Sequence, residues 1–358
     1  MKKHTTGKEA KLVIGVDLGD KHSEVCVIDE SGEVRVRTQL KTTAAAFEKF
    51  FAGMGPARIA MEVGTHSPWV SRLLNSWGHE VLVANARKVR LIYQSSSKSD
   101  RMDAEALARL ARLDPKLLSP IQHRSGERQS HLALLRARDA LVRARAQLVN
   151  HVRGSVKAMG GRLPACSTVA FATRASSHLP ETMRLALVPL LKVIEKLTEQ
   201  IDEAERGIGQ VARQHYPEVV VVTQPTGVGL LTGLRFVLTL EEPGRFRRNR
   251  TVGAYLGLTP RRSQSGDQDR QMHITKAGDS DLRRNLMQCS QYILGRFGPD
   301  SDLRRFGMKL AERGGKSAKK RALVAVARRL AVLMLSLWKT GEVYEPLRHA
   351  QVMARVPA

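Results

Sequence analysis

The chain has 358 residues, of which 42% are hydrophobic, so it can form two or three domains with real cores, and general disorder is excluded. Its 59 Lys and Arg against 34 Asp and Glu give a net charge of +25, which favours a polyanionic partner such as nucleic acid over a small substrate. No apolar run has membrane-spanning length, and Cys26, Cys166 and Cys289 lack the spacing of a zinc motif or a disulfide framework.

The first third of the chain predicts a β-sheet of mixed strand direction. The stretch LVIGVDLGDKHSEVCVIDESGEVRV reads as three short strands in a β-meander, and Asp17 lies on the first of them. A helix is expected over residues 44–51, followed by the strand RIAMEV with Glu62, a helix that opens with Ser-Pro, and the strand HEVLVA. With a further helix from Asp103, this order predicts a mixed sheet covered by helices.

The segment GVDLGDKHS is compatible with a second fold. It resembles the first phosphate loop of the actin and sugar-kinase fold, which shares the β-meander. That fold needs a second acidic, glycine-rich loop in a duplicated half, and the sequence contains no such loop. A charge of +25 also fits an ATP-dependent kinase poorly, so we do not favour this fold.

Two aspartates, Asp100 and Asp103, open the helix in the segment KSDRMDAEAL. An Asp at a helix start accepts backbone N–H bonds, so both residues can act as helix caps. Asp17 and Glu62 lie on apolar strands, where an isolated carboxylate is costly to bury without a cation or hydrogen-bond donors. Carboxylates from two strands and one helix start can bind two Mg²⁺ ions and support phosphodiester cleavage. The residues alone leave capping and metal binding open.

The middle of the chain, residues 126–217, predicts long helices. Leu134, Leu141 and Leu148 recur every seven residues, a spacing typical of a coiled-coil seam. A second series alternates spacings of four and three residues: Leu190, Ile194, Leu197, Ile201, Ala204, Ile208 and Val211. The helices either pack on each other as an antiparallel pair, joined by the Ser/Thr-rich segment 160–180, or use one seam to pair with another protomer.

The last third is rich in arginine and contains two candidate nucleophiles. The turn QPTGVG before a predicted helix exposes backbone N–H groups that suit a DNA phosphate. Ser263 and Ser265 lie in a polar, flexible stretch flanked by arginines, where a serine is usually a turn former but can also attack phosphorus. The residues that we predict to bind nucleic acid are Arg245, Arg247, Arg248, Arg250, Arg261, Arg262, Lys276, Arg283 and Arg284.

These motifs together resemble the DEDD-type insertion-sequence transposases, which combine an N-terminal RuvC-like domain with a C-terminal serine-containing transposase domain. That group includes the Piv-type DNA invertases and the bridge-RNA-guided recombinases. The N-terminal resemblance runs through GVDLGDKH, AMEVG and KSDRMDAEALARL. The C-terminal resemblance runs through QPTGVG, RFRRNRTVGAYLGLTPRRSQSG and ITKAGDSDLRRNL. Two independent resemblances in the right order cover most of the chain outside its helical middle.

The resemblance implies an α/β RNase H-like (RuvC-like) fold for the first domain, with a site for Mg²⁺ or Mn²⁺. The ligands that it implies are Asp17, Glu62, Asp100 and Asp103. It also implies that a serine of the SQSG segment forms a covalent link to a DNA end. We assign this catalytic role to Ser265, with Ser263 as the alternative.

The domains that we predict are a RuvC-like domain over 1–122, a helical coiled-coil segment over 123–217, a mainly α-helical serine transposase domain over 218–345 that starts like a helix-hairpin-helix, and a tail over 346–358. The resemblance implies DNA as substrate, a noncoding guide RNA encoded by the element, and a homo-oligomer, either a dimer or a tetramer. In that oligomer the RuvC-like domain of one protomer and the serine domain of another form a composite site. We expect no membrane partner and a location in the bacterial cytoplasm with the nucleoid.

Two other functions compete with a transposase. A Holliday-junction resolvase would use only the acids and water, so its serine would be dispensable. A non-catalytic nucleic-acid-binding protein would use the acids as helix caps and would bind in EDTA without cleaving any strand. The presence of both an acidic constellation and a separate basic, serine-containing segment favours the transposase.

Overall fold

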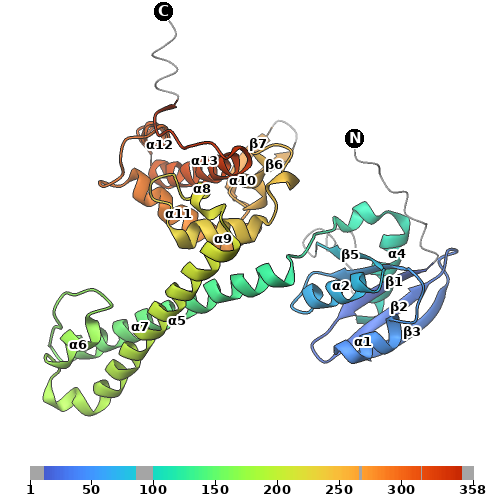
Figure 1. The fold of residues 1–358 in the computed structure, drawn as a ribbon, viewed down its shortest axis with the longest axis horizontal. Helices are drawn as coiled ribbons and strands as arrows, with labels where there is room; N and C mark the ends of the chain where they lie inside the picture. Colours follow the sequence, from blue (N-terminus) through green and yellow to red (C-terminus); the bar gives the residue numbers. More distant parts are fainter. Residues whose placement is uncertain (1–11, 86–99, 266–267, 316, 349–358) are drawn as a thin grey trace, which may run out of the picture. The chain divides into compact units, whose positions relative to one another are not determined.

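The computed structural model describes residues 12–85, 100–265, 268–315 and 317–348. For residues 100–101, 265 and 268–271 it describes the backbone alone. The chain divides into two compact units, Met1–Gly126 and Glu127–Ala358 (Figure 1). No helix in these described ranges is long and apolar enough to cross a membrane.

The N-terminal unit contains a five-stranded sheet in the order β3-β2-β1-β4-β5. Its strands are β1 (Val13–Leu18), β2 (His22–Ile28), β3 (Val34–Lys41), β4 (Arg58–Glu62) and β5 (Glu80–Ala84). β1 pairs antiparallel with β2 and parallel with β4, and β4 pairs parallel with β5. The predicted meander and the predicted mixed sheet are therefore confirmed.

Helices cover both faces of this sheet (Figure 1). The helices are α1 (Ala44–Phe51), α2 (Ser67–Ser76), α4 (Asp100–Leu113) and the 3-10 turn η1 (Pro115–Leu118). On one face, Phe47 and Phe51 of α1 pack with Val70 of α2 against buried side chains of β1 and β4. On the other face, α4 buries Leu107 and its alanines against the opposite side of the same strands. This layering agrees with the RNase H-like fold that we predicted.

A glycine on the central strand allows α4 to lie directly on the sheet. A Cβ atom added to Gly15 would lie 1.8 Å from the carbonyl oxygen of Ala104. Real side chains never approach a backbone that closely, so only glycine permits this packing. Gly15 therefore determines how closely the first turns of α4 approach β1.

The C-terminal unit begins with two long helices that lie side by side and antiparallel (Figure 1). They are α5 (Gly126–Ala158) and α7 (Glu181–His215), joined by a segment with the short helix α6 (Phe171–Ser176). At one end Val152 of α5 packs with Ile194 of α7, and at the other end Leu135 packs with Ile208. The predicted antiparallel pair is thus present within one chain.

The stripe that α5 buries differs from the predicted one. The structure buries Leu132, Leu135, Arg145, Val149, Val152 and Val156, whereas Leu134, Leu141 and Leu148 are half-buried. Polar contacts interrupt the apolar seam, because Arg138 pairs with Glu205 and Arg145 donates to Thr198. The seven-residue leucine spacing therefore identified the helix but not its most buried face.

The remainder of this unit is a helical domain with one β-ribbon. Its elements are α8 (Val219–Val222), α9 (Leu230–Leu240), η2 (Pro243–Arg245), α10 (Thr251–Tyr255), β6 (Pro260–Ser265), β7 (Gln268–Ile274), α11 (Ser280–Leu294), α12 (Asp302–Ala311) and α13 (Ala318–Thr340). Helices α9, α11 and α13 share one hydrophobic core, which also takes up the first turns of α5 and the end of α7.

Candidate functional site

Two predicted site residues follow the last paired positions of two adjacent parallel strands. Val16 of β1 is paired with Met61 of β4, and Asp17 and Glu62 come next on each strand. Parallel neighbours lie about 4.8 Å apart, so both acids occupy the carboxyl edge of the sheet as neighbours. Both side chains are half-buried.

The third acid comes from the beginning of α4, which is brought to the same edge. The carbonyl of Ala104 lies over Gly15, two residues before Asp17, whereas the carbonyl of Ala111 accepts from Arg58 at the start of β4. The helix therefore runs antiparallel to both strands, with its first turn at their carboxyl ends. Asp103 lies in that turn and is half-buried.

The donor chemistry of this edge suits a divalent cation, because carboxylate oxygens are the usual ligands of Mg²⁺ and Mn²⁺. Within the described residues, however, no three His, Cys, Asp or Glu side chains lie close enough together to hold a metal ion. The side chain of Asp100, the fourth predicted ligand, lies outside the described side chains. The structure thus brings together the ends of β1, β4 and α4, which carry three of the predicted ligands. The metal centre itself stays a prediction.

The loop after Glu62 is fixed by a buried serine and a histidine from further along the chain. Ser67 Oγ accepts from the backbone N–H of Gly64 at 3.0 Å and lies 2.8 Å from Nε2 of His123. Burial lowers the pKa of His123, and the charges of Arg72 and Arg124 lower it further. The neutral imidazole is therefore the form that the folded domain favours.

This histidine should make the stability of the N-terminal unit depend on pH. The pKa of His123 is lower in the folded than in the unfolded protein. Its contribution to the free energy of unfolding is therefore complete above about pH 6.5 and is lost as the pH falls below that value. We expect the denaturant concentration at the unfolding midpoint to decrease when the pH is lowered from 7.5 to 5.5. In His123→Gln this decrease should be smaller. Tryptophan fluorescence in a Trp338→Phe background would report this unit, because Trp69 and Trp77 both lie in it. An unchanged pH dependence in His123→Gln would contradict the assignment.

The two candidate serines lie on a β-strand, which the sequence analysis did not predict for this polar stretch. Ser263 is paired with Arg270 and Ser265 with Gln268 in the antiparallel ribbon of β6 and β7. Residues 260–265 are almost all polar, as in a solvated ribbon. Composition alone does not distinguish such a ribbon from a loop. Ser263 is exposed. Ser265 is the last residue of β6 and precedes residues 266–267, which the structure does not describe.

The predicted nucleic-acid-binding residues separate into two groups. Arg283 is used inside the protein, since its Nη1 donates to the carbonyls of Leu256 and Ala277 at 3.1 and 2.5 Å. Arg245 is exposed but also lies over the ring of Tyr255, 5.2 Å from its centroid. The remaining predicted residues are exposed: Arg247, Arg248, Arg250, Arg261, Arg262, Lys276 and Arg284.

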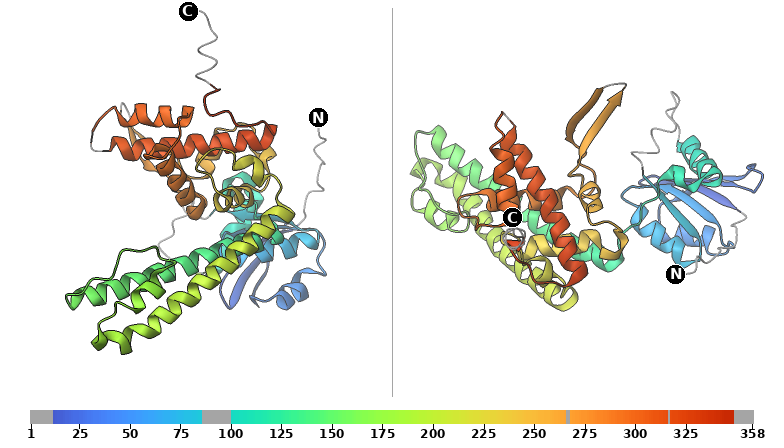
Figure 2. Two further views of the ribbon diagram at one scale, coloured as in Figure 1. Left: turned by 60° about the vertical axis from the view of Figure 1, so that its left-hand side comes forward. Right: turned by 90° about the horizontal axis from the view of Figure 1, so that it is seen from above.

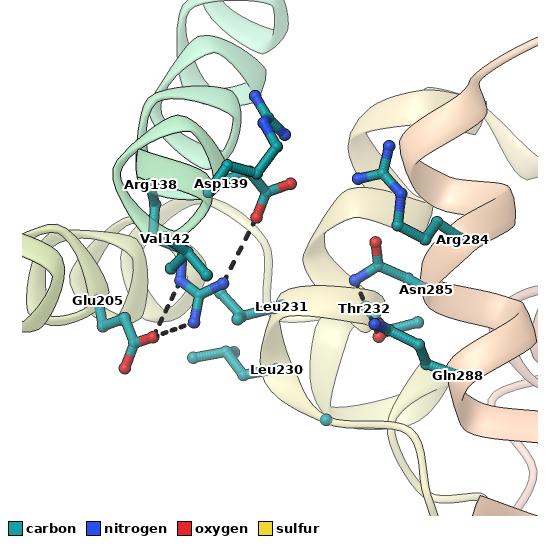
Figure 3. A pocket seen from close by; sticks show the side chains of 12 residues that line it. Arg138, Asp139, Val142, Glu205, Leu230, Leu231, Thr232, Arg284, Asn285 and Gln288 are labelled. Atoms are coloured by element: carbon teal, nitrogen blue, oxygen red, sulfur yellow. Dashed lines mark hydrogen bonds and ion pairs between the residues drawn. The ribbon is translucent and has the colours of Figure 1, made fainter. Parts of the chain in front are cut away.

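A groove of about 760 Å³ lies beside the start of α9 (Figure 3). The glycine turn predicted before this helix is present, with Gly229 as its N-cap and no side-chain cap. The charged residues that line the groove are Arg138, Asp139, Arg143, Glu205 and Arg284. Three arginines line the groove against two acids, so the groove keeps an excess of positive charge.

Below this groove is a buried arginine that the sequence analysis missed. Arg235 of α9 is 1% exposed, and its Nη2 donates to Asp139 Oδ2 at 2.8 Å while its Nη1 donates to Asn285 Oδ1 at 3.2 Å. The ion pair joins α5 to α9, and the hydrogen bond to Asn285 joins α9 to α11. Only the apolar neighbours of Arg235 in LLTGLRFVLTL hinted that its side chain would be buried.

Two models of known protein families match this chain. A family model described as a transposase, of the DEDD type of IS110, matches residues 14–159, which include the sheet and α4. A second model, described as the transposase IS116/IS110/IS902 family, matches residues 221–305, and together the two cover more than half of the chain. The chain belongs to the IS110 family of insertion-sequence transposases. Transposases of this family are enzymes that cleave and join DNA.

Individual relatives of the transposase match along most of its length. The transposase for insertion sequence element IS1111A of Coxiella burnetii is 29% identical over 96% of this chain and 93% of its own. The transposase for IS1328 of Yersinia enterocolitica is 29% identical over 79% of this chain and 84% of its own. A probable family 20 transposase of Pseudomonas aeruginosa is 28% identical over 78% of this chain and 83% of its own.

Proposed function

We propose that this transposase cleaves DNA at a metal centre on the carboxyl edge of its sheet and links one DNA end to Ser265. The observation that carries the proposal is the arrangement of Asp17 and Glu62 at adjacent strand ends, with the first turn of α4 over the same edge. The ligands that we propose are Asp17, Glu62, Asp100 and Asp103. A bound Mg²⁺ or Mn²⁺ would neutralise charge that develops on the scissile phosphate.

The chain's own residues would supply the nucleophile and the positive charge for strand cleavage. In the step that we propose, the Ser265 Oγ–P bond forms and the bond from phosphorus to the departing DNA oxygen breaks. The hydroxyl proton is lost from Ser265, and the departing oxygen takes up a proton. Exposed Arg261 and Arg262, whose side chains leave the strand on opposite faces, would each offset phosphate charge on the bound DNA.

Partners follow from the same proposal. The serine ribbon and the acids belong to different units, and we propose that the acids of one protomer act with the serine of another in a homo-oligomer. We further propose that a noncoding RNA from the element pairs with donor and target DNA. The net charge of +25 supports contact with polyanions, and it does not by itself distinguish RNA from DNA.

A covalent-adduct assay tests the serine assignment. The protein would be mixed with Mg²⁺, a plasmid that carries the gene with its native flanks, and RNA transcribed from those flanks. DNA that stays linked to protein in SDS is the expected product, and Ser265→Ala should abolish it. Ser263→Ala is a matched control, because it removes the same group two residues away on the same strand.

Each outcome of this assay has a definite meaning. Loss of the adduct in Ser263→Ala alone would move the nucleophile to Ser263. Cleavage without any adduct, unaffected by either substitution, would contradict the serine mechanism and leave a nuclease that uses the acids and water.

A further inference from the structure

The β6–β7 ribbon is an exposed structure that the fold of its unit does not require. Among the described residues, β6 and β7 pair only with each other, and the ribbon stands away from the helices of its unit (Figure 2). The side chains of residues 261–264 are exposed on β6, and Met272 on β7 keeps 56% of its surface exposed. A two-stranded ribbon buries little surface by itself, so contact with a partner would stabilise it.

The base of the ribbon is held firmly, although its strands project. Gly257, with φ +67°, lies so close to the other end of the ribbon that an added Cβ would be 2.3 Å from the backbone nitrogen of Ala277. Thr275 N donates to the carbonyl of Thr259 at 2.9 Å, and Arg283 ties both sides together through the carbonyls described above. The ribbon therefore projects from a fixed base beside α10 and α11.

Exposed arginines lie on this projection and on the chain segment that precedes α10. Arg261 and Arg262 are exposed on β6, and Arg247, Arg248 and Arg250 are exposed in the segment that precedes α10. Each arginine that reaches a phosphate releases condensed counterions and so favours binding to a nucleic acid. The charge and the shape of the ribbon therefore indicate the same class of partner.

The dimensions of the ribbon favour duplex DNA over duplex RNA. Its two strands are about 4.8 Å apart, and the major groove of B-form DNA, about 12 Å wide, admits a two-stranded ribbon with its side chains. The major groove of A-form RNA is deep and too narrow for side chains to read. Exposed Gln264 suits such a groove, because a glutamine amide can bond both N6 and N7 of adenine.

We propose that the β6–β7 ribbon inserts into the major groove of duplex DNA, beside the stretch that pairs with the proposed guide RNA. In this arrangement Arg261 and Arg262 bind phosphates, Gln264 contacts a base edge, and the Ser265 end of β6 is carried to the substrate. The proposal deepens the proposed function and rests on it for the identity of DNA as substrate. The insertion of the ribbon would position the DNA, whereas the assignment of Ser265 names only the group that attacks it.

Footprinting with dimethyl sulfate tests the proposal, because this reagent methylates guanine N7 in the major groove and adenine N3 in the minor groove. The probe is a DNA duplex with the native flanks of the gene, mixed with the full-length protein. We expect protection of guanine N7 by the wild type, and loss of that protection in the double variant Arg261→Ala/Arg262→Ala. The double variant should also lower the slope of log affinity against log salt by about two. Gln264→Ala should change the preferred bases with little change in that slope.

A charge-matched control separates this effect from a general loss of charge. Lys319→Ala/Lys320→Ala removes two exposed cations from α13 and should preserve the N7 footprint. Protection of adenine N3 alone, an equal effect of both double variants, or a ribbon variant that loses only duplex RNA binding would each overturn the proposal. Ser265→Ala should keep the N7 footprint. Failure of the adduct assay with an intact footprint would thus reject the nucleophile and leave the ribbon proposal standing.

Discussion

Replacing Asp103 by Asn is expected to lower DNA strand cleavage by about three orders of magnitude while leaving the protein folded. Asp103 lies in the first turn of α4, over the edge of the sheet where Asp17 and Glu62 end adjacent strands. An amide keeps the size of the side chain but removes the negative charge that a divalent cation needs in its ligand. The measurement is cleavage of plasmid DNA carrying the native flanks in Mg²⁺, with thermal unfolding as the check on folding.

A control on the same helix makes this prediction specific. Asp114 follows the other end of α4, where its side chain accepts from the backbone N–H of Lys116 at 2.9 Å. Asp114→Asn removes the same charge far from the carboxyl edge and should keep its cleavage activity. Wild-type cleavage by Asp103→Asn would contradict the metal assignment and leave that carboxylate as part of a helix start.

Replacing Asp139 by Ala is expected to destabilise the C-terminal unit by about 3 kcal/mol. The substitution leaves the guanidinium of Arg235, which is 1% exposed, without its carboxylate partner. Arg235→Met should cost less, because Asp139 would still have Arg138 and is itself partly exposed. Hydrogen exchange of the amides of α9 and α11 would measure this difference, since both helices contact the ion pair.

A surface pair on α7 provides the comparison. Glu199 is exposed and pairs with exposed Lys196, and such pairs contribute at most about 1 kcal/mol. Glu199→Ala should therefore leave exchange in α9 and α11 unchanged. Equal effects of Asp139→Ala and Glu199→Ala would show that the buried pair does not stabilise the junction of α5, α9 and α11.

Local patterns in the sequence were sufficient for most elements of the N-terminal unit. Alternating apolar strands and the Ser-Pro helix start placed β1 to β5, α1 and α2, because strand and helix periodicity depend on near neighbours. They also placed Asp17 on a strand and Glu62 at the end of another. The seven-residue spacing of leucines in α5 predicted a long helix, but the most buried stripe includes Arg145 and lies elsewhere on that helix.

Two features of the C-terminal unit depended on tertiary contacts. The stretch around Ser263 is polar and arginine-rich, like a loop, and it forms a strand because β7 satisfies its backbone hydrogen bonds. Arg235 is buried because Asp139, 96 residues earlier in the chain, neutralises it. No local rule predicts a pairing of that separation.

The sequence by itself determined the elements of the N-terminal unit, the places of Asp17 and Glu62 on its strands, the basic charge and the family resemblance. Only the tertiary structure decided that α4 runs antiparallel to β1 and β4, with its first turn at their carboxyl ends. The absence of a side chain at Gly15 determines how closely that turn approaches the strands, because it lets the backbone of Ala104 lie directly on the sheet. Close packing between residues distant in the chain, which no local periodicity records, thus determines where the first turn of α4 meets the strand ends.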